Sequence, residues 1–126
     1  MDLSALTKVF PTENFDAGKV LFQQGDLDGD GFIILQGSVE LRREENGITQ
    51  TGIYLYKEEI FGVYKTIFEN KARNFTAVTR EPSRIIRIPE RVLKNKLEST
   101  DPFILLCMRN WSELNTRLIN AEKKEG

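Results

Sequence analysis

The sequence predicts an α+β fold: an antiparallel β-roll of the jelly-roll type, with a short helix before it and two helices after it. Eight of its nine glycines lie between residues 18 and 62, and short apolar stretches alternate with them. This pattern is typical of short strands joined by tight turns. Apolar residues at helical spacing occur mainly before and after this section.

Length and composition set the limits of the fold and exclude several functions. The chain has 126 residues, 40% hydrophobic and 29% charged, which suits one domain over residues 1–126. Its net charge of −1 gives no basic field for nucleic acid, and no apolar run approaches the ~20 residues of a membrane span. One cysteine excludes an internal disulfide. We expect a cytoplasmic protein without a signal peptide.

Histidine is absent, which removes the commonest general acid–base group and the commonest metal ligand. Together with the lack of a paired-carboxylate motif, this predicts a protein that is not an enzyme. The segment 26–31 copies the first half of a calcium-binding loop, but the twelfth position, which needs a bidentate glutamate, is Gly37. We therefore expect neither a metal site nor a resident cofactor.

The N-terminal segment, residues 1–14, is predicted to be a short helix. Ser4 is the candidate N-cap, and Leu6, Val9 and Phe10 would form its apolar face. Pro11 would end the helix or follow it.

The β-roll is predicted over residues 15–88. Residues 31–41 alternate with a period of two, which would place one set of residues on a shared face: Ile33, Leu35, Gly37, Val39 and Leu41. Asn46-Gly47 predicts a hairpin turn, because both residue types tolerate positive φ. The last two strands would lie on either side of a turn at 81–83.

Two helices are predicted over residues 89–120, followed by a frayed tail at 121–126. The first would begin after Pro89, and the second at Pro102, capped by Thr100 or Asp101. The second helix has an apolar face that either covers the roll or forms a homodimer seam through Met108, Trp111, Leu114 and Leu118. We expect no DNA-binding helix-turn-helix segment in this chain.

Segment 18–41 also combines glycines, apolar positions and an aspartate at spacings that occur together in one family. With Phe15, the matching residues are Gly18, Leu21, Phe22, Gly25, Asp26, Phe32, Ile33, Ile34, Gly37, Val39 and Leu41. The segment resembles the opening strands of cyclic-nucleotide-binding domains, and Gly29 stands where that family has a second aspartate. The resemblance covers residues 2–119 and implies the predicted order of helix, roll and two helices.

In the resembled family, one segment holds the ligand. A glycine turn and a one-turn helix face the cyclic phosphate, an arginine neutralises it, and a glutamate binds the ribose. The corresponding residues here are Phe61, Gly62, Val63, Tyr64, Arg73 and Asn74. By itself, Arg73 could equally be a surface arginine in a basic loop.

Two positions depart from the family pattern. Val63 replaces the ribose glutamate and cannot accept a hydrogen bond, and the bulky Phe75 follows Asn74 where the family has alanine. Two functions therefore stay open. The chain is either a regulatory domain that binds cyclic AMP or cyclic GMP and rearranges its C-terminal helices, or a degenerate relative that serves only protein interaction or dimerisation.

Overall fold

The computed structural model describes residues 3–125, with side chains through residue 121. The chain divides into two compact units, Met1–Leu93 and Lys94–Gly126, and each is described by itself. Within the described residues, no helix combines the length and the apolar character that a membrane-spanning segment requires.

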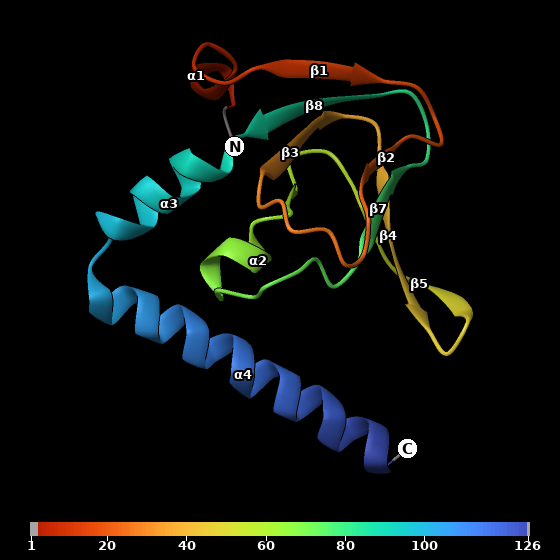
Figure 1. The fold of residues 1–126 in the computed structure, drawn as a ribbon, viewed down its shortest axis with the longest axis vertical. Helices are drawn as coiled ribbons and strands as arrows, with labels where there is room; N and C mark the ends of the chain where they lie inside the picture. Colours follow the sequence, from red (N-terminus) through yellow and green to blue (C-terminus); the bar gives the residue numbers. More distant parts are fainter. Residues whose placement is uncertain (1–2, 126) are drawn as a thin grey trace. The chain divides into compact units, whose positions relative to one another are not determined.

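The first unit is built from eight strands in two antiparallel four-stranded sheets (Figure 1). The first sheet has the order β1-β8-β3-β6, and the second has the order β2-β7-β4-β5. The strands are β1 (Thr12–Phe15), β2 (Val20–Phe22), β3 (Gly31–Gln36), β4 (Val39–Glu45), β5 (Ile48–Leu55), β6 (Ile60–Phe61), β7 (Thr76–Thr79) and β8 (Ser83–Ile88). With a short helix α1 (Ser4–Thr7), this is the predicted β-roll.

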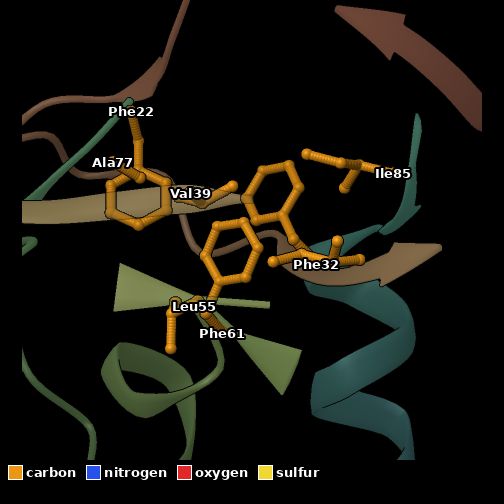
Figure 2. Packing of buried hydrophobic residues seen from close by; sticks show 8 residues of the cluster. Phe22, Phe32, Val39, Leu55, Phe61, Ala77 and Ile85 are labelled. Atoms are coloured by element: carbon orange, nitrogen blue, oxygen red, sulfur yellow. The ribbon is translucent and has the colours of Figure 1, made fainter. Parts of the chain in front are cut away.

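The main hydrophobic core takes side chains from both sheets (Figure 2). Phe22 comes from the second sheet, and Phe32 and Phe61 come from the first. The three rings form an aromatic cluster, with centroids 5.8 Å apart for Phe22–Phe32, 6.3 Å for Phe22–Phe61 and 5.2 Å for Phe32–Phe61. These spacings fall within the favourable range for aromatic pairs, so the cluster ties the two sheets together.

A second apolar cluster contains Leu3, Ile33, Ile86 and Ile88. It lies on the other face of the first sheet, because Ile33 and Ile86 alternate with core residues along their strands. Residues of the N-terminal segment and of the first turn of α3 pack against it: Leu6, Phe10, Val92 and Leu93. The first sheet is therefore apolar on both faces, which explains the continuous apolar run at 32–34.

The N-terminal segment differs from its prediction. The N-cap of α1 is Leu3 rather than Ser4, and no side chain caps the helix. Val9 is exposed, whereas Leu6 and Phe10 pack as predicted. Strand β1 begins inside the predicted helical segment 1–14, where residues 12–15 pair with β8 (Figure 1). The sequence lacks a local signal for this strand, since its partner lies some seventy residues away.

The predicted shared face at 31–41 is wrong. Ile33 and Leu35 belong to the outer cluster, whereas Val39 and Leu41 pack with the core between the sheets. The reason is a corner: Gly37, with φ of +96°, lets the chain leave the first sheet after β3 and enter the second as β4. Alternation therefore holds within each strand but not across the corner.

The predicted hairpin turn at Asn46-Gly47 is confirmed. The two residues have φ of +54° and +78°, and Glu45 pairs with Ile48 across a two-residue loop. Both values lie in the left-handed region that a type I′ turn requires. The predicted last strands are also present as β7 and β8, with the turn between them.

The two predicted C-terminal helices are α3 (Glu90–Glu98) and α4 (Pro102–Glu125). Pro89 immediately precedes α3 as predicted, and the Phe103 amide donates to Asp101 Oδ1 at 2.8 Å, which makes Asp101 the cap of α4. Helix α4 continues through Glu125, beyond the predicted end at residue 120, so residues 121–125 are helical rather than a separate tail. Gly126 lies outside the described residues.

Candidate functional site

The candidate site is a cavity of about 290 Å³ in the first unit. All six residues predicted for the ligand site line it: Phe61, Gly62, Val63, Tyr64, Arg73 and Asn74. They come from β6, from the turn into the short helix α2 (Tyr64–Ile67) and from the loop before β7. The structure therefore brings together residues that the sequence separates into two segments.

Gly62 makes the turn that the site requires. Its φ is +80°, and a Cβ at this position would lie 3.0 Å from the Asp30 carbonyl oxygen and 3.3 Å from Arg73 Nη1. Any other residue would therefore meet both a left-handed backbone and a crowded site. The short helix α2 follows at once, as the sequence predicts.

Arg73 is buried, with 4% of its surface exposed. Nη1 donates to the Gly62 carbonyl at 2.5 Å. Nη2 donates to the Asp30 carbonyl at 2.7 Å and to Asp28 Oδ2 at 2.9 Å. The guanidinium is therefore bound to three acceptors of the protein itself, two of them main-chain carbonyls.

The same guanidinium lies against an aromatic ring. Its central carbon is 4.0 Å from the centroid of Phe22, which joins it to the aromatic cluster of the core. The Arg73 Nε atom is buried and has no hydrogen-bond partner among the described residues. The interpretation of Arg73 as a surface arginine is wrong. This side chain fastens the loop before β7 to the turn at Gly62 and to the loop before β3.

Val63 and Phe75 occupy the positions that depart from the family pattern. The side chain of Val63 covers Gly31, because a Cβ on that glycine would lie 2.7 Å from Val63 Cγ1. Phe75 lines the cavity, and its ring also lies against Gly52 of β5. The direction of Phe75, which the sequence leaves open, is therefore toward the cavity, where its ring takes up space.

Asp30 supports the site, although the sequence motif does not include this residue. Its carbonyl binds Arg73, its Oδ1 accepts from the Glu90 amide at 2.8 Å, and its Oδ2 pairs with Arg87 at 3.2 Å. One residue thus joins the Arg73 loop to the first turn of α3. The aspartate-rich segment 26–31 was the available signal: Asp28 and Asp30 bind arginines and a helix end.

Arg87 extends this network to β1. Its Nε and Nη2 donate to the Glu13 carboxylate, at 3.1 Å and 2.9 Å for the shortest contacts. Hydrogen bonding to Glu13 raises the pKa of Arg87 above its ordinary value, against the opposing effect of partial burial, and Asp30 adds to the rise. Arg87 therefore stays charged and links β8 to β1 through the Glu13 carboxylate.

The family model for the cyclic nucleotide-binding domain matches residues 12–100. The match covers more than half of the chain and includes both sheets, the cavity and α3. The chain belongs to the cyclic nucleotide-binding domain family, and it has that family's regulatory fold.

Comparison with individual proteins agrees with this family. The chain is 28% identical over 120 residues to the global nitrogen regulator of a Nostoc species, covering 92% of this chain and 52% of that protein. It spans about half the length of this relative. The catabolite activator protein of Thermus thermophilus superposes with a TM-score of 0.68 at 23% identity, over 97% of this chain and 56% of that one. A cAMP-bound EAL enzyme superposes with a TM-score of 0.75 at 20% identity, over 89% of this chain and 30% of that one. At these identities, the two structures support the fold alone.

Proposed function

We propose that the chain is a regulatory domain with the cyclic nucleotide-binding fold that does not itself bind cyclic AMP or cyclic GMP. The observation that carries this proposal is the state of Arg73, whose guanidinium is buried and bound to Gly62, Asp28 and Asp30. A ligand phosphate would have to displace these partners. This is the degenerate-relative alternative, favoured by the geometry over the nucleotide sensor.

Nucleotide binding would carry two energetic penalties. Moving Arg73 to a phosphate would leave the carbonyls of Gly62 and Asp30 without their donor, at about 1–3 kcal/mol each. The ribose hydroxyl would also lack an acceptor at Val63, which costs a similar amount. Together these penalties weaken binding by at least roughly a hundredfold relative to a family member that has the glutamate and an available arginine.

We expect calorimetric titration of the full chain with cyclic AMP and with cyclic GMP to give no heat of binding at micromolar concentrations. The Val63→Glu variant supplies the missing ribose acceptor and therefore separates the ribose penalty from the penalty of displacing Arg73 from its partners. We expect this variant still to bind neither nucleotide at micromolar concentrations, because its protein partners would still hold Arg73. Micromolar binding of either nucleotide to the unmodified chain would contradict the proposal.

We also propose that the chain forms a homodimer through α4. The four seam residues are exposed in the structure: Met108 at 40%, Trp111 at 68%, Leu114 at 39% and Leu118 at 63%. Their spacing of three and four residues places them along one stripe of the helix, and a second copy of the same stripe would complement it. A helix of 24 residues gives this stripe ample length for a paired contact.

The variant Trp111→Ala is expected to weaken self-association by at least about tenfold, because it removes the largest apolar side chain of the stripe. Arg117→Ala lies on the same helix but outside the stripe and is the control. It should change the dissociation constant of the dimer little. Sedimentation equilibrium at micromolar concentration measures both. A strictly monomeric unmodified chain, or equal effects of the two variants, would count against the dimer.

A further inference from the structure

We propose that the cavity takes a small, mainly apolar ligand about the size of a bicyclic aromatic molecule. The inference deepens the proposed function and rests on it, because it assumes that the cavity does not hold a cyclic phosphate. It assigns to the regulatory domain a class of ligand in place of the nucleotide.

The walls of the cavity are aromatic and aliphatic. Phe22, Leu55 and Phe61 belong to the buried core and line its inner side. Leu41, Ile53 and Phe75 add apolar surface from β4, β5 and the loop before β7. Both sheets therefore contribute to one apolar concave surface, which is the usual character of a small-molecule site.

Few polar side chains reach this surface. Arg73 lines the cavity, but its guanidinium donates to protein acceptors and stacks on Phe22. The other two charged or amide side chains among the lining residues are Lys65 and Asn74. A strongly charged ligand would lose its hydration against the apolar walls without enough partners in return. An apolar ligand loses little and gains contacts with the aromatic rings.

The volume indicates how large a group the cavity can hold. An engineered apolar cavity of roughly 150 Å³ holds one benzene molecule. The present cavity, at about 290 Å³, has room for about two such rings. A cyclic nucleotide has a two-ring base, a ribose and a phosphate ring, which is more than two such rings. Phe75 is one of the groups that restrict the space.

The test uses the full chain and the probe 2-naphthol, a neutral bicyclic molecule. We expect saturable binding with one site per chain and a sub-millimolar dissociation constant. Methyl NMR locates the probe. The resonance of Ile53, which lines the cavity, should shift on binding, whereas that of Ile86, on the outer face of the first sheet, should not.

Two variants test whether the probe binds in this cavity. Ala72 lines the cavity on the loop before β7, so Ala72→Phe places a ring in the ligand's space and should weaken binding at least about tenfold. Lys71→Phe adds the same ring to the neighbouring exposed position and should leave the affinity within about twofold. Circular dichroism verifies that both variants are folded.

The possible failures are distinct. Absence of saturable 2-naphthol binding, or unchanged affinity in folded Ala72→Phe, would overturn the ligand inference and leave the proposed function intact. Micromolar binding of cyclic AMP or cyclic GMP would overturn the proposed function, and the ligand inference with it. Saturable 2-naphthol binding that is weakened by Ala72→Phe alone, without nucleotide binding, supports both.

Discussion

Replacement of Arg73 with alanine is expected to lower the free energy of unfolding by at least about 3 kcal/mol. The change leaves the Gly62 and Asp30 carbonyls without their donor and removes the partner of Asp28. Each hydrogen bond to a charged group contributes about 1.5–3 kcal/mol. Loss of the stacking on Phe22 adds to this. Thermal denaturation followed by circular dichroism should show the midpoint lowered by roughly 10 °C or more.

Two further variants give this prediction its controls. Arg73→Met keeps a long unbranched side chain but removes both the hydrogen bonds and the guanidinium contact with Phe22, so its loss of stability should lie close to that of alanine if these polar contacts dominate over side-chain packing. Arg43→Ala breaks an ion pair whose two side chains are 52% and 68% exposed, and should change stability by less than about 1 kcal/mol. An Arg73→Ala protein as stable as Arg43→Ala would refute the anchoring role of Arg73.

Replacement of Gly37 with alanine is expected to be equally severe. The backbone has φ of +96°, and the new Cβ would lie 2.2 Å from Ser83 Oγ and 2.8 Å from Ser83 Cα. Backbone strain of about 1–3 kcal/mol then combines with a steric conflict against main chain, which rotation of the serine side chain cannot relieve. We expect a loss of at least about 3 kcal/mol, measured by urea denaturation, or failure to fold.

Gly18 offers a matched control for this effect. Its φ is +80°, and a Cβ there meets nothing within 4 Å, so Gly18→Ala introduces the backbone strain without the steric conflict. We expect a loss of about 1–2 kcal/mol. Similar losses in the two variants would show that strain alone acts at Gly37 and that its close approach to Ser83 is not decisive.

The sequence predicted most of the fold because its signals are local. The hairpin at Asn46-Gly47 follows from two residues that tolerate positive φ, and the start of α4 follows from Asp101 and Pro102. The prediction failed where long-range pairing decides. Strand β1 forms because β8 offers a partner, and the corner at Gly37 separates residues that a regular alternation would place together.

The candidate site also combines features that the sequence predicts with contacts that only the tertiary structure decides. The motif placed Phe61, Gly62, Val63, Tyr64, Arg73 and Asn74 in one site, and the structure lines one cavity with all six. The sequence by itself thus determined the family and most of the strands, and it predicted six residues that line one cavity. Only the tertiary structure decided what Arg73 does. Its partner Asp28 lies 45 residues away, and Asp30 lies 43 residues away. Such contacts depend on how the sheets bring distant loops together, which spacing along the chain does not encode.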